Sequence, residues 1–140
     1  MKILLAVDGS PYTQKMLDYL ATHAGLLGGT HDYTAVTVQA PLPPRARSAL
    51  GKEMVDQYYA EEADKVLTPV CDFLAKHQVQ AKRLSQVGPA GETIAKLATE
   101  GQFDLLVMGT HGHGAFGKLV MGSVSTQVLA NCTTPVLLVR

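Results

Sequence analysis

The segment GTHGHGAFGKLVMGSVS, from Gly109 to Ser125, has the residue types and spacing of a phosphate-binding loop. Glycine lets backbone approach a ligand closely, and the free N–H groups at the start of a helix attract anions. The segment fits three different phosphate-loop templates. Which template applies therefore depends on the other residues that each template requires.

Two of the templates fail on residues that their chemistry requires. Gly112 to Gly117 spells the dinucleotide fingerprint G-x-G-x-x-G, which needs an acidic residue about 20 positions later to hold the ribose. No Asp or Glu follows Asp104 in this chain. Gly112 to Lys118 spells the first seven positions of a P-loop, but Leu119 stands where that loop needs a hydroxyl for magnesium.

The third template consists of Gly109, Gly112 and the pair Gly122-Ser123. Gly109 is expected to let the chain turn sharply off a strand, and Gly112 to let backbone approach a ligand. Gly122-Ser123 is expected to open the last helix as an anion site. The Ser123 hydroxyl has two possible roles, a cap for that helix or a ligand for a phosphate oxygen.

The ionisable residues of the segment are His111, His113 and Lys118, all neutral or cationic. This charge suits a polyphosphate. His111 and His113 also form an H-x-H pair, but no third Cys, His or carboxylate lies near them in sequence, so we do not expect a metal site.

Composition restricts the class of protein. The chain has 140 residues, 46% hydrophobic and 17% charged, with twelve basic and twelve acidic side chains. This composition predicts one globular domain over residues 1–140. Because the charges balance, the protein has no net electrostatic field that would attract nucleic acid or an anionic membrane. The apolar run Ile3–Val7 is too short for a signal peptide or a spanning helix. Cys71 and Cys132 lack the spacing of metal ligands, and we expect both side chains to be buried in the core. So few cysteines suit a reducing compartment, and we therefore expect a cytoplasmic protein.

Apolar runs and helical periodicity alternate along the chain. Strands are predicted at Lys2–Val7, Tyr33–Val38, Val79–Val87, Asp104–Met108 and Pro135–Val139. Four helices are predicted between them: one after Ser10-Pro11, a long one from Met54 to Leu74, one over Glu92–Thr99 and one around Val124–Leu129.

The second of these helices is expected to bury Met54/Val55 and Tyr58/Tyr59 on its apolar face, and Pro69 is expected to kink or split it. Gln39 to Gly51, with three prolines and with Arg45 and Arg47, is predicted to be a flexible surface loop.

The alternation predicts an α/β fold: a single doubly wound domain with a five-stranded parallel sheet and helices on both faces. In such folds ligands bind beyond the carboxyl ends of the strands, where the strand order reverses. If the first and fourth strands are neighbours, Asp8 and Gly109 flank that crevice. Asp8 is then either a ligand for the bound molecule or a capping residue for the first helix.

The spacing G-x2-G-x9-G-[ST] after the fourth strand resembles the nucleotide-binding motif of the universal stress protein family. The strand and turn ILLAVDGS (3–10), the breaker VGP (87–89), DLLVMG (104–109) and TPVLLV (134–139) are similar to segments of the same family. The resemblance implies a Rossmann-like sheet of order 3-2-1-4-5. It also implies a homodimer through the last strand, Pro135 to Val139, an apolar edge strand that needs cover.

The branch of the family with this motif binds ATP or AMP, with Mg²⁺ where a triphosphate brings it. Asp8 is similar in position to the residue that meets the ribose or adenine, and Val38 to the backbone that reads the adenine edge. The implied nucleotide-binding residues are Ala6, Val7, Asp8, Val38, Met108, Gly109, His111, Gly112, His113, Gly122, Ser123, Val124 and Ser125.

The resemblance also implies a homodimeric regulatory switch in the stress response. Two alternatives remain open: a slow ATP hydrolase or phosphotransferase, and a dimerisation module with an unoccupied pocket. No triad spacing or activated nucleophile favours an enzyme.

Overall fold

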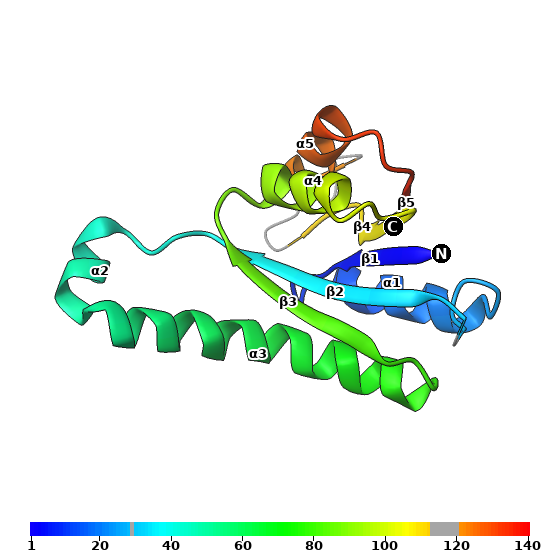
Figure 1. Ribbon diagram of the computed structural model, residues 1–140, viewed down its shortest axis with the longest axis horizontal. Helices are drawn as coiled ribbons and strands as arrows, with labels where there is room; N and C mark the ends of the chain where they lie inside the picture. Colours follow the sequence, from blue (N-terminus) through cyan, green and yellow to red (C-terminus); the bar gives the residue numbers. More distant parts are fainter. Residues whose placement is uncertain (29, 113–120) are drawn as a thin grey trace.

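Five parallel strands form one sheet in the order β3-β2-β1-β4-β5 (Figure 1). The structure is a computed structural model that describes residues 1–28, 30–112 and 121–140. The strands are β1 (Lys2–Ala6), β2 (Asp32–Gln39), β3 (Ala81–Val87), β4 (Leu105–Gly109) and β5 (Val136–Val139). The predicted fold and strand order are confirmed.

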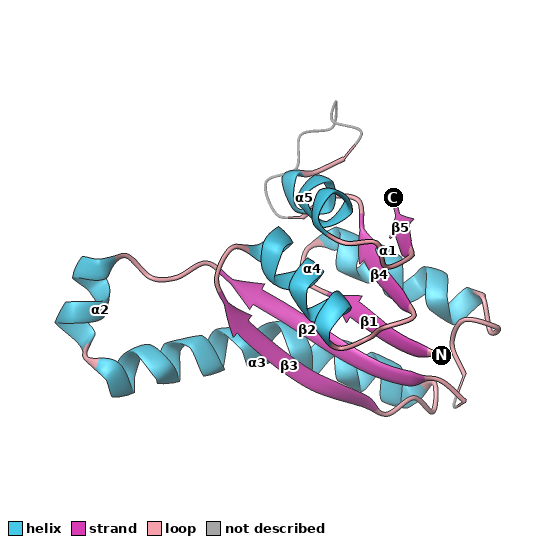
Figure 2. Ribbon diagram, turned by 45° about the horizontal axis from the view of Figure 1, so that its top comes forward, coloured by secondary structure: helices cyan, strands magenta, loops and turns pink. Residues whose placement is uncertain are grey.

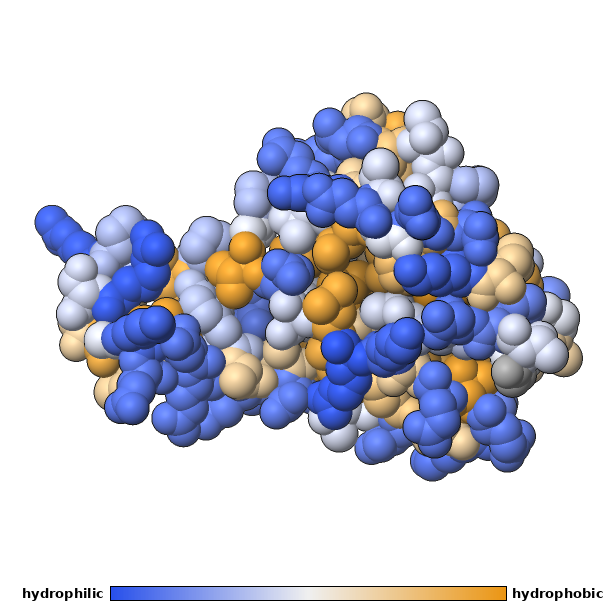
Figure 3. Space-filling view, viewed as in Figure 1, coloured by the Kyte–Doolittle hydropathy of each residue, from blue (hydrophilic) through white to orange (hydrophobic). Residues whose placement is uncertain are grey.

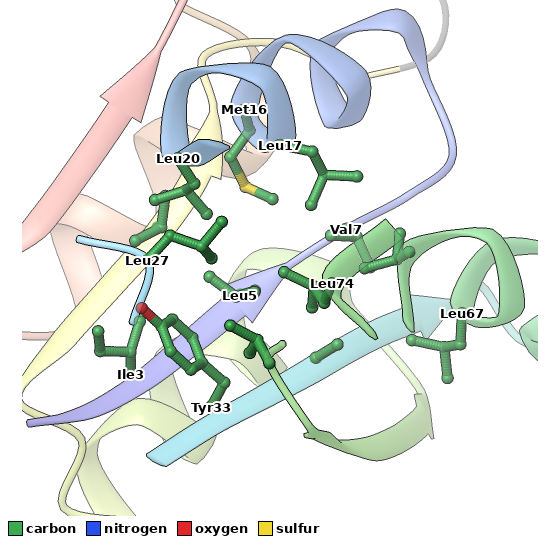
Figure 4. Packing of buried hydrophobic residues seen from close by; sticks show 14 of the residues in the cluster. Ile3, Leu5, Val7, Met16, Leu17, Leu20, Leu27, Tyr33, Leu67 and Leu74 are labelled. Carbon is green, nitrogen blue, oxygen red and sulfur yellow. The ribbon is translucent and has the colours of Figure 1, made fainter. Parts of the chain in front are cut away.

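Helices cover both faces of this sheet (Figure 2). They are α1 (Pro11–Thr22), α2 (Pro44–Leu50), α3 (Lys52–Lys76), α4 (Ala90–Glu100) and α5 (Ser123–Asn131). Successive residues of β1 point to opposite faces. Ile3 and Leu5 join the core with α1 and α3 (Figure 4), while Leu4 joins the core with α4 and α5. Burial on both faces explains why this strand is a continuous apolar run.

Tyr33 shows how a polar group is accommodated in the first of these cores. The residue is 1% exposed, and its hydroxyl donates a hydrogen bond to the carbonyl of Leu26. Burial raises the pKa of the Tyr33 phenol above its ordinary value. The buried hydroxyl therefore stays protonated and paired.

The segment Gln39 to Gly51 is not the irregular loop that the sequence predicted. It contains α2, so the described chain has five helices where four were expected. Pro43 precedes the helix and Pro44 is its first residue, a position where the missing N–H of proline costs nothing. Gly51, at φ +80°, then separates α2 from α3.

The long helix α3 is continuous through Pro69, where the sequence predicted a kink or a split. Val55, Ala63, Leu67, Val70 and Leu74 are buried along one face of it, and this packing outweighs the lost backbone hydrogen bond. The expected burial of Met54 and Tyr58 is wrong, because their exposed fractions are 57% and 41%.

Two smaller expectations concern the cysteines and the membrane. Cys71 and Cys132 are half-buried free thiols, not fully buried ones. Of the helices in the described ranges, none has both the length and the apolar character needed to cross a membrane.

Candidate functional site

The chain leaves β1 through a turn organised by the Asp8 carboxylate. Its Oδ1 accepts hydrogen bonds from the Ser10 N–H at 2.9 Å and from the Thr13 hydroxyl at 3.0 Å. The Thr13 oxygen in turn accepts from the N–H groups of Asp8 at 3.1 Å and Gly9 at 3.2 Å. Gly9 has a φ of +76°, which favours glycine. One oxygen of Asp8 therefore holds the turn that enters α1, although the N-cap position itself belongs to Ser10.

The other carboxylate oxygen of Asp8 faces the glycine segment after β4. A Cβ atom added to Gly112 would overlap Oδ2 of Asp8. β1 and β4 are neighbours, with Ala6 opposite Met108, so the two segments leave the sheet side by side. The expected convergence of Asp8 with the glycine segment is observed, and it explains why residue 112 has no side chain.

Gly109 is required for a different reason from the one expected. Its backbone is not in the left-handed region, and it still belongs to β4. A Cβ atom on Gly109 would lie 2.7 Å from the Cβ of Tyr12, well inside contact distance. Gly109 therefore permits close packing with α1 and not a sharp turn.

Tyr12 links α1 to the residues after β4. Its ring lies 5.0 Å from that of His111 between centroids, and the Lys15 ammonium lies 4.7 Å from the Tyr12 ring centroid. The Nδ1 atom of His111 lies 2.9 Å from the Thr110 hydroxyl. His111 therefore lies beside the Tyr12 ring and the Thr110 hydroxyl at the edge of the candidate site.

Helix α5 begins at the same place and is tied to the end of β4. The Gly122 N–H donates to the Thr110 carbonyl at 2.7 Å. The buried Ser125 hydroxyl lies 3.0 Å from the Thr110 carbonyl oxygen and 3.2 Å from that of Gly109. The side chain of Ser125 is therefore a tie between the two elements, which leaves only its backbone to meet a ligand.

Ser123 is the first residue of α5, and its side chain is exposed. Gly122 occupies the N-cap position and makes no side-chain cap hydrogen bond. The alternative in which Ser123 caps the helix is therefore wrong. Since the first amides of a helix have no partner within it, the start of α5 presents N–H groups of Ser123 and Val124 next to an exposed hydroxyl.

The other predicted site residues lie at the carboxyl ends of the central strands. Ala6, Val7 and Met108 are buried there, and the Val7 N–H donates to the Val36 carbonyl at 2.9 Å. Val38 is half-buried on β2, two residues beyond Val36, the partner of Ala6. His113 lies outside the described residues.

Three neighbours of the site were absent from the predicted set: Tyr12, Thr13 and Thr110. Thr13 and Thr110 are buried and hold the turns that carry Asp8 and His111. The five-residue separation of Asp8 and Thr13 offers a weak signal. A hydroxyl in the first turn of a helix commonly forms hydrogen bonds with a residue of the preceding turn, but many such pairs have no functional role. Nothing in the sequence marks the contact of Tyr12 with Gly109.

The described residues offer polar and glycine chemistry at this site, and no cluster for a metal. No three His, Cys, Asp or Glu side chains in the described ranges are grouped so as to hold an ion. Asp8 supplies one carboxylate beside a close-packed glycine, and the start of α5 supplies N–H donors. The Asp8 carboxylate can accept hydrogen bonds from hydroxyl groups of a ligand, and the N–H donors at the start of α5 can bind an anion.

Comparison with known proteins identifies relatives over the whole chain. The model of the "Universal stress protein family" matches residues 1–140. A Coxiella burnetii protein, universal stress protein A homolog 1, is 31% identical over 138 residues, which cover 98% of this chain and 94% of that protein. A Thermus aquaticus universal stress protein is 33% identical, covering 99% and 97%.

The relatives differ in length. The Synechocystis universal stress protein Slr1230 is 34% identical over 139 residues, but the chain spans only 42% of it. The chain therefore corresponds to nearly all of some universal stress proteins and to less than half of others.

Solved structures share the fold. The Methanocaldococcus jannaschii protein MJ0577 has a TM-score of 0.79 and 24% identity, with 99% of this chain and 94% of that chain covered. A universal stress protein in complex with cAMP has a TM-score of 0.70 at 21% identity, covering 100% and 97%. The Archaeoglobus fulgidus protein in complex with dAMP has 0.67 at 22%, covering 100% and 98%.

Proposed function

The chain belongs to the universal stress protein family, and on that premise we propose that it binds an adenine nucleotide at the carboxyl ends of β1 and β4. The observation that carries the proposal is the contact between Asp8 and Gly112. It brings an acceptor for hydroxyl groups next to a glycine segment that leads to the start of a helix. Structural neighbours solved with cAMP, dAMP and AMP support the class of ligand.

In this proposal the nucleotide lies across the switch point of the sheet. Asp8 accepts from the ribose hydroxyls, and the backbone of Val38 reads the adenine edge. The phosphates lie between Gly112 and the start of α5, where the amides and hydroxyl of Ser123 and the amide of Val124 donate to them. ATP and AMP both fit this order of groups, and a triphosphate would bring Mg²⁺ with it.

We assign the site to binding and not to turnover of the nucleotide. Hydrolysis needs a base at the γ-phosphate. Asp8 is at the nucleoside end in this arrangement, and its Oδ1 already holds the α1 turn. The proposed role is a nucleotide-responsive regulatory switch in the stress response of the cytoplasm, acting as a homodimer through β5.

The direct test is the nucleotide content of the protein after gentle purification, read by native mass spectrometry and by chromatography of the released ligand. We expect a bound adenine nucleotide in the wild type and a loss of it in Gly122→Val. A Cβ at Gly122 lies 3.3 Å from backbone atoms of Thr110 and His111, so a branched side chain must displace the start of α5. Equal occupancy in both proteins, or a different ligand class, would contradict the assignment.

A further inference from the structure

Two cations flank the end of β4, one carried by β5 and the other by α1. Val139 of β5 lies opposite Gly109, and its carbonyl accepts from the Thr110 N–H at 2.9 Å. The Thr110 carbonyl in turn accepts from the Gly122 N–H at 2.7 Å. Arg140 follows Val139 directly and is exposed, so the chain places it beside the residue that ties the start of α5 to β4.

Lys15 is held beside the same segment by an aromatic ring. Its ammonium lies 4.7 Å from the centroid of the Tyr12 ring, and that ring lies 5.0 Å from the His111 ring. Tyr12 itself packs against Gly109, where an added Cβ would lie 2.7 Å from the Tyr12 Cβ. One aromatic ring therefore separates the Lys15 ammonium from the imidazole that follows β4. Exposed cation–π contacts are weak, so a phosphate group can draw this ammonium away from the ring.

In the described part of the chain, no acidic side chain forms an ion pair with Lys15 or Arg140. The ion pairs there involve other cations, namely Lys65, Lys82, Arg83 and Lys96. The first turn of α1 has no acidic residue, and no Asp or Glu follows Asp104 in the sequence. Asp18, one turn after Lys15, accepts from the Gln14 side chain instead. The corner between the start of α1 and the end of β5 therefore has positive charge that a ligand can neutralise.

The proposed order of the nucleotide along the sheet directs its terminal phosphates to this corner. The strands run in the order β2-β1-β4-β5, with neighbours about 4.8 Å apart. Adenine is assigned to Val38 on β2, the ribose to Asp8 after β1, and the first phosphate to Gly112 and the start of α5. Further phosphates then continue past β4 toward the end of β5. Asp8, the acid of the site, remains at the nucleoside end of this order, two strands away from β5.

We propose that Lys15 and Arg140 bind the β- and γ-phosphates of a nucleoside triphosphate, and that the site therefore prefers ATP to AMP. This inference rests on the proposed nucleotide binding and adds the class of nucleotide to it. Ammonium and guanidinium groups form charge-assisted hydrogen bonds with phosphate oxygens. In this arrangement neither side chain contacts the nucleoside or the first phosphate. AMP therefore keeps all of its contacts when either cation is removed, whereas ATP loses one.

Calorimetric titration of ATP and of AMP into the wild type, Lys15→Gln and Arg140→Gln tests the assignment. The titrations contain EDTA, so that no Mg²⁺ shares the phosphate charge, and low salt, where exposed charges are least screened. We expect the wild type to bind ATP at least about fivefold more tightly than AMP. Each variant should bind ATP about three- to tenfold more weakly and AMP within about twofold of the wild type. Lys15→Arg keeps the charge and should keep the ATP affinity within about twofold.

Lys76→Gln is the matched control, because it removes the same charge from an exposed lysine in the last turn of α3. Hydrophilic side chains are frequent along α3 on the face seen in Figure 3, so a lysine there is an ordinary surface residue. We expect this variant to bind both nucleotides like the wild type. Equal wild-type affinities for ATP and AMP, or variants at Lys15 and Arg140 that weaken both nucleotides or neither, would overturn the inference and leave the nucleotide site in place. A wild type that binds neither nucleotide would overturn the proposed function as well.

Discussion

Asp8 has two tasks, one for each oxygen of its carboxylate. Oδ1 holds the turn into α1 through Ser10 and Thr13, while Oδ2 faces Gly112. A single residue therefore couples the local fold to the candidate site. The two tasks can be separated, because asparagine keeps an acceptor at Oδ1 and removes the charge.

We predict that the free energy of unfolding of Asp8→Asn, measured in urea, lies within about 1 kcal/mol of the wild-type value, because the hydrogen bonds of the turn persist. Asp8→Ala should lose about 1–3 kcal/mol, since two donors are left without their acceptor. Both variants should bind ATP and AMP at least roughly tenfold more weakly. Wild-type affinity in Asp8→Asn would show that the carboxylate does not contact the nucleotide.

Residue types and spacing singled out Gly109 and Gly112 but did not predict what each of them contacts. The neighbours that exclude a Cβ are Tyr12 of α1 at Gly109 and Asp8 of the preceding turn at Gly112, and both follow β1 in the chain. Contacts of that kind depend on the packing of distant segments. The sequence motif therefore predicts the positions at which glycine is needed, while the fold shows which neighbouring atoms leave no room for a side chain.

At the scale of elements, the first turn of α5 carries two serines in different surroundings. Ser125 is buried against the carbonyls of Gly109 and Thr110, whereas Ser123 is exposed. The two side chains therefore provide a matched pair of truncations on one helix.

We predict that Ser125→Ala lowers the free energy of unfolding by about 1–2 kcal/mol, because buried carbonyls lose a donor. Ser123→Ala should change it by less than about 0.5 kcal/mol and should weaken nucleotide binding instead. Urea denaturation and nucleotide titration of both variants check the pair. A reversed pattern would place Ser123 in the fold and Ser125 in the site.

The helix α3 is where local propensity was a poor guide. Pro69 predicted a kink or a split, and the split is wrong, because five buried side chains keep the helix continuous through this residue. The helix α2 was missed for the related reason that consecutive prolines resemble a loop, although proline is favourable in a first helical turn. Both errors come from the position of a proline within its element, which composition does not reveal.

We predict that Pro69→Ala stabilises the protein by about 1–2 kcal/mol. The substitution restores a backbone donor in an exposed part of α3, and this gain exceeds the added freedom of the unfolded chain. Thermal unfolding followed by circular dichroism would show a higher midpoint. A lower midpoint would indicate that the proline ring makes packing contacts of its own.

At the scale of the whole molecule, the alternation of strands and helices predicted the doubly wound α/β fold, and the family resemblance implied the sheet order; the structure confirms both. The fold class was the most predictable level, because strands that alternate with helices imply a parallel sheet with helices on both faces. The association of chains is less accessible to sequence. β5 is a half-buried edge strand of four apolar residues. Whether an edge strand pairs with another chain depends on the side chains and segments that cover it, and these come from distant parts of the sequence.

The carbonyls of Pro135 and Val139 accept hydrogen bonds from Leu106 and Thr110 of the β4 side. In an extended strand the intervening Val136 N–H then points to the free edge. We predict that Val136→Pro, at the first residue of β5, keeps the fold but weakens the proposed β5 dimer. Light scattering should give a lower mass than for the control Val136→Thr. Equal masses would argue against pairing through this edge.

The measurement that tests the central claim most directly is a calorimetric titration of ATP and AMP into the wild type, Gly112→Ala and Gly25→Ala. A Cβ at Gly112 displaces the Asp8 carboxylate, whereas a Cβ at Gly25 meets no atom within 4 Å. We predict saturable binding to the wild type and to Gly25→Ala, and binding at least roughly tenfold weaker in Gly112→Ala. A folded wild-type protein that binds neither nucleotide at about millimolar concentration would contradict the account.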